Sequence, residues 1–247
     1  MMLNEMTKQK LYEMKLSAMA KAYHNQIDDP SMKSFSFEER LGMMVDAEWA
    51  GRRNNRLGRL IRNADFQIGG ACIEGIEYHD DRKLNREHIS QLATCEYIAE
   101  KHNIIILGAA GAGKTYLSCA FGMAACRQFY SVKYVRLPEL LNELAVARDE
   151  GQFQKAIALY KKAGLLILDE WLLLPLRETE ARDLLEIVEA RHKRGSTIFS
   201  SQFAPAGWHA KIGEGTLADA ILDRIVHDSY TIVIEGTESM RKRKGIQ

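Results

Sequence analysis

The sequence predicts an α/β fold in which a central parallel sheet has helices on both faces and follows a small all-helical region. Between residues 100 and 235, β-prone runs alternate with helical patterns, and the runs are continuously apolar, as in strands buried on both faces. One of these runs leads directly into a glycine-rich loop that opens a helical pattern. We therefore expect a helical domain over residues 1–68 and an α/β domain over residues 69–247.

The composition is ordinary for a globular protein, with 247 residues, 46% of them hydrophobic and 27% charged, and a net charge of only +1. Any contact with nucleic acid must therefore come from local basic patches. No run approaches the roughly 18 apolar residues of a membrane span, and residues 1–10 lack a signal-peptide pattern. We therefore expect a cytoplasmic protein without a membrane partner. The four cysteines and seven histidines show no metal-ligand spacing, so we interpret the cysteines as reduced core residues.

The first predicted element is a helix over residues 4–27, whose apolar residues follow one stripe. The sequence Asp-Asp-Pro at residues 28–30 ends it. Ser36 with Glu39 three residues later is typical of a capping box, and it predicts a long helix that ends near Asn63.

Five arginines and no acidic residue lie between Trp49 and Ala64 on this long helix: Arg52, Arg53, Arg56, Arg59 and Arg62. One interpretation is a solvated helix face whose arginine stems pack along a neighbour. The other is contact with DNA phosphates, for which the candidates are Arg52, Arg53, Arg56 and Arg59. The residues alone do not favour either interpretation. Zinc-finger and aromatic RNA-binding motifs are missing from the sequence, so base-specific contacts are not indicated.

Two glycines at residues 69 and 70 mark a joint, after which residues 71–82 have an irregular pattern and residues 85–100 a helical one. The next residues, 104–115, read I-I-I-L-G-A-A-G-A-G-K-T, which is the G-x-x-x-x-G-K-T phosphate-binding loop in its strand–loop–helix context. Its glycines allow a tight turn whose N–H groups point at an anion. The nucleotide-binding candidates are Gly108, Ala109, Ala110, Gly111, Ala112, Gly113, Lys114, Thr115 and Tyr116.

Within this loop, Lys114 is expected to reach the β- and γ-phosphates, and the Thr115 hydroxyl to complete a Mg²⁺ shell. The sequence therefore predicts a protein that binds a nucleoside triphosphate, ATP, together with Mg²⁺. The predicted elements that follow are a helix over 115–129, a strand over 131–135, a helix over 139–147, a helix over 152–162 and a strand over 165–168.

Asp169 and Glu170 end this last apolar run, 55 residues after Lys114, which leaves room for one strand and two helices between the motifs. Both motifs then lie at the carboxyl edge of the sheet. We expect Asp169 to hold Mg²⁺ through water and Glu170 to activate the water that attacks the γ-phosphate. The pair of acids favours ATP hydrolysis over phosphate transfer to a small molecule.

A third β-run covers residues 196–202 and ends in polar side chains at the same edge. On a strand between the two motif strands, Gln202 can touch the γ-phosphate and the attacking water. The alternative is that Ser201 and Gln202 only cap the strand and contact solvent.

A helix over residues 217–225 carries Arg224 near its end. One hypothesis is that Arg224 enters the active site of a neighbouring subunit. The other is a structural ion pair with Asp219, Asp223 or Asp228. The basic tail at residues 241–244 is either a solvated terminus or a phosphate contact.

Taken together, these segments resemble the IstB-like helper ATPases of insertion sequences, which are relatives of the bacterial helicase loader DnaC. The resemblance covers nearly the whole chain. It is carried by E-R-L-G-M-M-V-D-A-E-W-A-G-R-R-N-N-R-L-G-R-L-I-R at 39–62, G-A-A-G-A-G-K-T at 108–115, L-L-I-L-D-E at 165–170, T-I-F-S-S-Q at 197–202 and A-D-A-I-L-D-R-I at 218–225. The first and last of these are more specific to the family than the phosphate-binding loop.

The resemblance implies a three-layer AAA+ ATPase that assembles on duplex DNA, with ATP at the interfaces between its subunits. It implies DNA remodelling and the recruitment or stimulation of a transposase, and it favours DNA or partner contact for the arginines. By the same likeness, Gln202 falls at the sensor-1 position, where relatives more often have Asn or Asp. Arg224 falls at the arginine-finger position and would act in trans. The usual helical lid is missing or vestigial, so Arg241 is given no sensor-2 role.

We therefore expect a DNA-binding AAA+ ATPase that helps a transposase. The nearest alternative is a helicase loader whose client is a replicative helicase. A metabolic P-loop kinase, the third hypothesis, would have a small-molecule pocket and no affinity for DNA, and both Glu170 and the helix of Arg224 argue against it.

Overall fold

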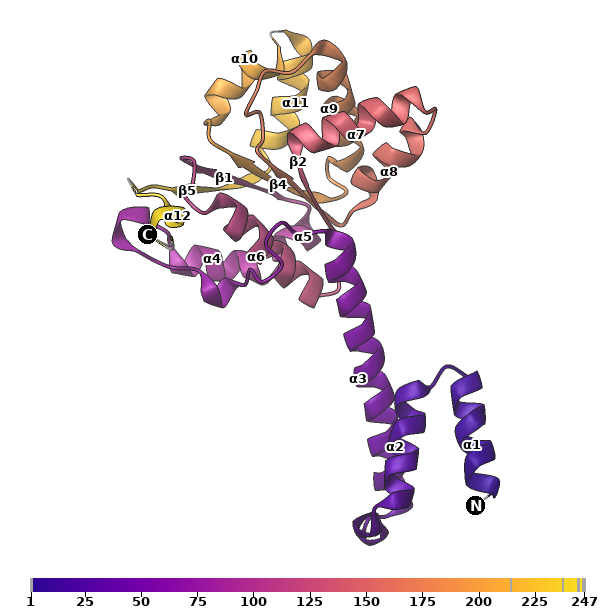
Figure 1. Cartoon of the computed structure of the whole chain (residues 1–247). Helices are drawn as coiled ribbons and strands as arrows, with labels where there is room; N and C mark the ends of the chain where they lie inside the picture. Colours follow the sequence, from indigo (N-terminus) through magenta and orange to yellow (C-terminus); the bar gives the residue numbers. More distant parts are fainter. Residues whose placement is uncertain (1, 214, 237, 244, 246–247) are drawn as a thin grey trace. The chain divides into compact units, whose positions relative to one another are not determined.

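A five-stranded sheet forms the centre of the α/β part of the chain (Figure 1). The computed structural model describes residues 2–213, 215–236, 238–243 and 245. The strands are β1 (Asn103–Gly108), β2 (Val132–Arg136), β3 (Leu165–Asp169), β4 (Ser196–Ser201) and β5 (Ser229–Ile234), in the order β2-β3-β4-β1-β5. All their pairings are parallel. Strand β4 therefore lies between the strands of the two motifs, β1 and β3, as the sequence predicts.

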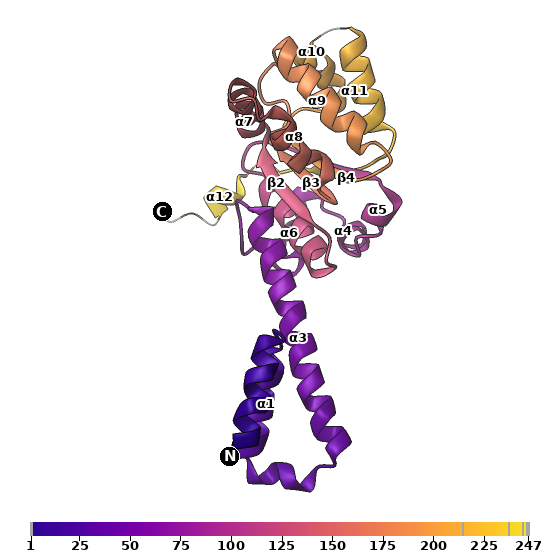
Figure 2. The same cartoon turned by 90° about the vertical axis from the view of Figure 1, so that its right-hand side faces the viewer.

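Helices cover both faces of this sheet (Figures 1 and 2). One face carries α4 (Arg86–Ala93), α5 (Glu96–Glu100) and α6 (Lys114–Arg127). The other carries α7 (Leu137–Asp149), α8 (Phe153–Lys162), α9 (Glu178–Arg191), α10 (Trp208–Ile212) and α11 (Thr216–Val226). On the second face a buried cluster includes Trp171, Phe199 and Trp208, whose rings pack edge to face or tilted. The predicted three-layer α/β arrangement is confirmed.

Short turns of 3₁₀ helix and one small helix complete the chain. They are η1 (Pro30–Ser34), η2 (Ile73–Gly75), η3 (Asp80–Arg82), η4 (Pro205–Gly207) and α12 (Met240–Arg243). Three cysteines, Cys95, Cys119 and Cys126, are buried in the core, and burial raises the pKa of each thiol to about 11. Cys72 is half-buried. Among the described residues, no helix combines the length and the apolar character that crossing a membrane requires.

The chain divides into two units, Met1–Arg59 and Leu60–Gln247, so the division falls nine residues before the boundary expected after residue 68. Contacts of the segment that follows α3 (Phe37–Ala64) explain the difference. The ring of Phe66 packs against Gly122 of α6 so closely that a Cβ at Gly122 would collide with it. The hydroxyl of Tyr134, on β2, lies 2.7 Å from the side-chain amide of Gln67. This segment therefore belongs to the second unit, Leu60–Gln247, which contains the sheet and which we call the ATPase unit after the activity that the sequence predicts.

The N-terminal unit contains α1 (Met2–Glu13), α2 (Ser17–Asp28) and most of α3. The prediction of one helix over residues 4–27 is wrong, because the chain turns at Lys15, which has a left-handed φ of 59°. The N–H of Leu16 donates to the carbonyl of Leu11 (2.8 Å), and that of Lys15 to Tyr12 (2.9 Å), a Schellman motif. This position usually holds glycine, so the sequence gives no signal for the break.

The helix predicted over residues 85–100 is likewise two helices, α4 and α5. Cys95 lies between them with a left-handed φ of 66°. Here too, a residue other than glycine takes the left-handed conformation.

Helix α2 has no capping side chain of its own, because Leu16 occupies its N-cap position. The carboxylate of Glu48, from α3, accepts the N–H groups of Ala18 (2.9 Å) and Met19 (3.1 Å) instead. Glu48 also accepts a hydrogen bond from Arg52 Nε at 2.8 Å, and this contact lowers the pKa of the Glu48 carboxyl. Arg52 therefore has a structural task within the N-terminal unit. The predicted capping box of Ser36 and Glu39 is present.

Candidate active site

The phosphate-binding loop connects β1 to α6 and takes the shape that its glycines allow. Gly111 and Gly113 have left-handed φ values of 76° and 95°, and Gly113 is the N-cap residue of α6. The first N–H groups of α6 and its positive dipole end therefore face the loop, as anion binding requires. Lys114 is buried, and its Nζ donates to the carbonyls of Gly108 (2.8 Å) and Ala109 (2.9 Å).

Asp169, at the end of β3, is buried beside Thr115, whose hydroxyl donates to Asp169 Oδ2 at 2.6 Å. One hydroxyl and one carboxylate fit Mg²⁺, which prefers oxygen ligands and keeps several waters beside nucleotide phosphates. Among the described residues, no group of three or more His, Cys, Asp or Glu could hold a metal. A cation at Asp169 would therefore depend on the phosphates for much of its shell.

Glu170 follows Asp169 with a left-handed φ of 54°, and its N–H donates to Asp169 Oδ1 at 2.9 Å. Its carboxylate is partly exposed and lies 3.9 Å from Arg136, at the end of β2. Arg136 also forms a hydrogen-bonded ion pair with Glu139 of α7. The ion pair of Arg136 with Glu170 is therefore weaker than its hydrogen-bonded pair with Glu139, so the Glu170 carboxylate is only loosely held.

A cavity of about 210 Å³ is lined by most of the residues that the sequence predicts for ATP hydrolysis. Its lining includes Lys114, Thr115, Asp169, Glu170 and Gln202. These side chains come from the P-loop, the end of β3 and the residue after β4, so the sheet topology brings them together.

Sequence reasoning missed Ser200, which lines the same cavity from β4. Its hydroxyl is fully buried and has no hydrogen-bond partner in the part of the chain that the structure describes. Ser201 instead donates to the carbonyl of Trp171 (2.9 Å), and Gln202 is exposed beyond the end of the strand. Because side chains alternate along a strand, residues 200 and 202 are expected on the same face. This spacing is the sequence signal that could have identified Ser200.

A second cavity, of about 320 Å³, adjoins the other side of the P-loop. No residue had been predicted for the nucleoside, and this cavity supplies candidates. It is lined by Gln67, Ile68, Gly75, Ile76, Glu77, Arg82, Gly111, Gly113, Lys114, Thr115, Tyr116, Leu117 and Met240. The Tyr116 hydroxyl lies 3.4 Å from both the N–H and the carbonyl of Cys72, so it holds the segment before η2 over the cavity.

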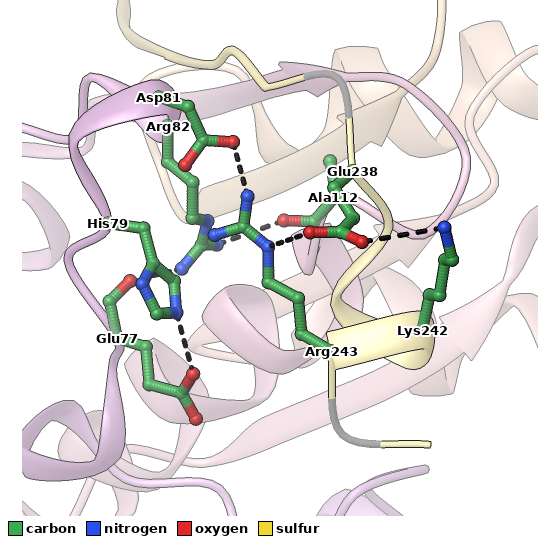
Figure 3. Close-up of polar contacts among 8 residues, drawn as sticks. All are labelled: Glu77, His79, Asp81, Arg82, Ala112, Glu238, Lys242 and Arg243. Carbon is green, nitrogen blue, oxygen red and sulfur yellow. Dashed lines mark hydrogen bonds and ion pairs between the residues drawn. The ribbon is translucent and has the colours of Figure 1, made fainter. Parts of the chain in front are cut away.

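The C-terminal segment reaches this second cavity through Met240, and Figure 3 shows the polar contacts that Glu238 and Arg243 make nearby. The N–H of Met240 donates to the carbonyl of Gly111 at 2.9 Å, and a Cβ at Gly111 would collide with Ser239. Arg243 pairs with Asp81 (2.5 Å) and Glu238 (3.4 Å). Within the basic tail at 241–244, Arg243 thus has intramolecular partners, while Lys244 lies outside the described residues.

Arg224 lines neither of these two cavities. Its guanidinium donates to the carbonyl of Ala220 (2.7 Å) and pairs with Glu189 of α9 (3.1 Å). The alternative of an ion pair with Asp219, Asp223 or Asp228 named the wrong carboxylates, because the partner lies on a different helix. Arg224 therefore lies outside both cavities that adjoin the P-loop of its own chain.

The four candidate DNA-binding arginines are all exposed on α3. Arg52 is engaged by Glu48, and the guanidinium of Arg53 stacks over the exposed ring of Trp49 at 4.6 Å. Arg56 and Arg59 continue the row toward the end of the helix.

Tyr134 is a buried neighbour of the Asp169 carboxylate, with its hydroxyl 2.9 Å from Asp169 Oδ2 and 2.7 Å from Gln67 Oε1. Burial raises the pKa of Tyr134, so its hydroxyl stays protonated. A hydroxyl has one proton, so Tyr134 can donate to only one of these two oxygens, Asp169 Oδ2 or Gln67 Oε1, at a time.

We expect Tyr134→Phe to raise the Mg²⁺ concentration needed for half-maximal ATP hydrolysis about 10-fold, the usual effect of losing an outer-shell partner. Nucleotide affinity without Mg²⁺ should not change. Tyr160→Phe is the matched control, since that buried hydroxyl donates to Glu143 and lines neither cavity. A magnesium dependence equal to that of wild type would exclude this role for Tyr134.

A family model and individual relatives place the chain in the same family. A family model described as IstB-like ATP binding protein matches residues 9–247. An insertion sequence ATP-binding protein of Sinorhizobium fredii is 40% identical over 243 residues, which are 98% of this chain and 98% of that protein.

Two solved structures share the fold. DnaA of Aquifex aeolicus, bound to AMPPCP, matches with a TM-score of 0.59 and 22% identity over 73% of this chain and 54% of that chain. The DnaC helicase loader matches with a TM-score of 0.55 and 16% identity over 67% of this chain and 97% of that chain. At these identities, the likeness identifies the AAA+ fold alone.

Proposed function

Since the chain belongs to the family of IstB-like ATP-binding proteins of insertion sequences, we propose that it is an ATP-dependent helper of transposition. The protein is an AAA+ ATPase. In our proposal it assembles as an oligomer on duplex DNA, remodels the DNA, and recruits or stimulates a transposase. The observation that carries the catalytic part is the single cavity that joins Lys114, Thr115, Asp169, Glu170 and Gln202.

Each of these residues has a task that its chemistry suits. When bound, Mg²⁺-ATP supplies a γ-phosphoryl group that water can attack. Lys114 and the N–H groups that begin α6 would balance the phosphate charge, and Thr115 and Asp169 would hold the metal through oxygen atoms. Glu170 would orient the water and take its proton. Ser200, on the strand between the motif strands, and Gln202, just after that strand, would contact the water or the phosphate.

Assembly would complete this site. Arg224 lines neither of the two cavities beside the P-loop of its own chain, which supports a role in the site of a neighbouring subunit. To reach such a site, its guanidinium would have to leave Glu189, a partly exposed partner on the same chain. ATP would then bridge subunits, and its hydrolysis would loosen the assembly on DNA.

The helicase-loader alternative has weaker support. The match to the DnaC helicase loader has 16% identity, whereas the relative from an insertion sequence has 40% identity over nearly the full length of both chains. The partner that fits this family context best is therefore a transposase.

Replacing Arg53, Arg56 and Arg59 together by alanine tests the DNA-binding part of the proposal. We expect weaker binding to duplex DNA. The slope of log affinity against log salt concentration should also fall in magnitude by up to about three, because each arginine that pairs with a phosphate contributes about one to this slope. Arg52 is left in place because it supports the cap of α2 through Glu48. Binding is measured with a non-hydrolysable ATP analogue by sedimentation, which also reports the oligomer.

The matched control replaces Arg127, Arg177 and Arg182, exposed arginines of the ATPase unit that pair with glutamates, so that the charge changes equally. Its salt slope should equal that of wild type. If the α3 variant has the same salt slope as wild type, its arginines do not contact DNA phosphates and form a solvated helix face. Wild-type protein that stays a single subunit and ignores DNA when saturated with nucleotide would contradict the proposed function.

A further inference from the structure

Two arginines are buried in the ATPase unit, Arg82 (6% exposed) and Arg191 (3% exposed). Within the described residues, neither forms a hydrogen bond or ion pair with a carboxylate. Taking a guanidinium out of water is costly unless its charge and its donors are compensated. The two arginines differ in how far that compensation goes.

Arg191 is compensated by acceptors from two parts of the fold. Its Nε donates to Thr197 Oγ1 (2.9 Å), its Nη1 to the carbonyls of Tyr160 (3.0 Å) and Ala163 (2.6 Å), and its Nη2 to the carbonyl of Ser196. These hydrogen bonds join the end of α8 to the start of β4. Arg191 is therefore a structural arginine, and all three of its nitrogens are used.

Arg82 is compensated less well. Its Nη1 donates to the carbonyl of Glu77 and its Nη2 to the carbonyl of Ala112 in the P-loop (2.9 Å; Figure 3). Its Nε is buried and has no hydrogen-bond partner in the part of the chain that the structure describes. A guanidinium has five N–H donors, so this arginine keeps unused capacity directly beside the loop.

The charges around Arg82 do not supply the missing partner. Asp81 is paired with Arg243, and the carboxylate of Glu77 is 3.0 Å from His79 (Figure 3). Burial, the largest effect, lowers the pKa of Arg82; the charges of Glu77 and Asp81 oppose this effect, and the charge of Arg243 adds to it. Arg82 also lines the second cavity together with Lys114 and Thr115. The cavity that Arg82 lines therefore includes P-loop residues that are expected to bind phosphate, beside those available to the nucleoside.

We propose that Arg82 is a further nucleotide-binding residue, whose charge and free Nε serve the phosphate chain of the nucleotide. The inference rests on the nucleotide site proposed above. It gives the segment from Tyr78 to Arg82, which the sequence shows only as irregular, a direct part in binding. It also explains why a buried arginine is tolerated against the backbone of the P-loop without a carboxylate.

The test compares two substitutions at this position by isothermal titration calorimetry with ATP, ADP and AMP. Arg82→Gln keeps neutral donors that can reach the Ala112 carbonyl but removes the charge, and it should weaken ATP binding about 10- to 100-fold, as loss of a charge-assisted hydrogen bond does. The effect should be smaller for ADP and smallest for AMP. Arg82→Lys keeps the charge and should retain most of the preference for ATP over AMP.

Two controls separate the possible failures. Arg191→Gln should lower the melting temperature and leave the three affinities unchanged. Lys114→Ala should remove ATP binding. The proposed role of Arg82 is wrong if Arg82→Gln binds ATP like wild type while Lys114→Ala does not. It is also wrong if Arg82→Gln weakens the binding of ATP and of AMP equally. Neither result contradicts the nucleotide site itself. If Lys114→Ala also binds normally, the proposed nucleotide site itself is wrong.

Discussion

Replacement of Lys114 by alanine is expected to abolish nucleotide binding. The ammonium group is buried at the start of α6 and donates to the carbonyls of Gly108 and Ala109. In the bound state it would exchange these neutral acceptors for phosphate oxygens, and each charge-assisted hydrogen bond contributes about 1.5 to 3 kcal/mol. Removing the hydrogen bonds to two phosphates should therefore weaken ATP binding by at least about 100-fold.

Calorimetric titration of ATP measures this effect directly. Lys101→Ala is a suitable control, because Lys101 Nζ also donates to a backbone carbonyl, that of Ile98 (3.2 Å), but lines neither nucleotide cavity. The control should bind ATP like wild type. If Lys114→Ala binds ATP with the affinity of wild type, residues 108–115 are not the phosphate-binding loop. The proposals about ATP hydrolysis, which depend on that loop, would then be wrong.

Glu170→Gln is expected to keep ATP bound while turnover falls by about 10²- to 10⁴-fold, the usual contribution of a positioned general base. Glutamine has nearly the same shape but cannot accept the proton of the attacking water. The ATP-bound oligomer should then persist on DNA, because the step that loosens it is blocked. Steady-state hydrolysis, together with sedimentation on duplex DNA, measures both effects.

The control for this variant is Glu139→Gln. Glu139 is the other carboxylate that contacts Arg136, and it does not line the cavity that holds Lys114 and Asp169. Its replacement removes a surface ion pair, so turnover should stay within a few-fold of wild type. Hydrolysis at the wild-type rate in Glu170→Gln would mean that another group activates the water.

The parts of the site that are written in short sequence motifs could be predicted, because local spacing determines their geometry. The P-loop fixes the positions of Lys114 and Thr115 relative to β1 and α6, and the parallel sheet brings the end of β3 beside them. The place of Gln202, directly after β4, followed from the same topology, whereas Ser200 was missed. The α/β fold class, confirmed by the strand order, depends on the same continuous apolar runs.

Other parts of the site depend on residues far apart in sequence. The second cavity combines Gln67, Arg82 and Met240 with the P-loop, and no periodicity predicts that these segments meet. The partner of Arg224 is Glu189, 35 residues away on another helix, whereas sequence reasoning considered only acids nearby. The breaks at Lys15 and Cys95 were invisible because the usual glycine is missing there.

Some elements were missed although the sequence carried a signal. Helix α9 has buried apolar residues with helical spacing at Ala181, Leu184 and Val188, and no helix was predicted there. Strand β5, residues 229–234, reads S-Y-T-I-V-I, a β-prone run that was also left out. Neither omission changed the predicted fold class, since both elements extend the same alternating pattern.

Trp171 lines the hydrolytic cavity and packs edge to face against Trp208, while its indole N–H has no hydrogen-bond partner among the described residues. Indole emission depends on the polarity and charge around the ring. The unmodified chain therefore carries its own optical reporter beside Glu170. We therefore expect tryptophan emission to change when a ligand fills or leaves this cavity, without a dye on either protein or nucleotide.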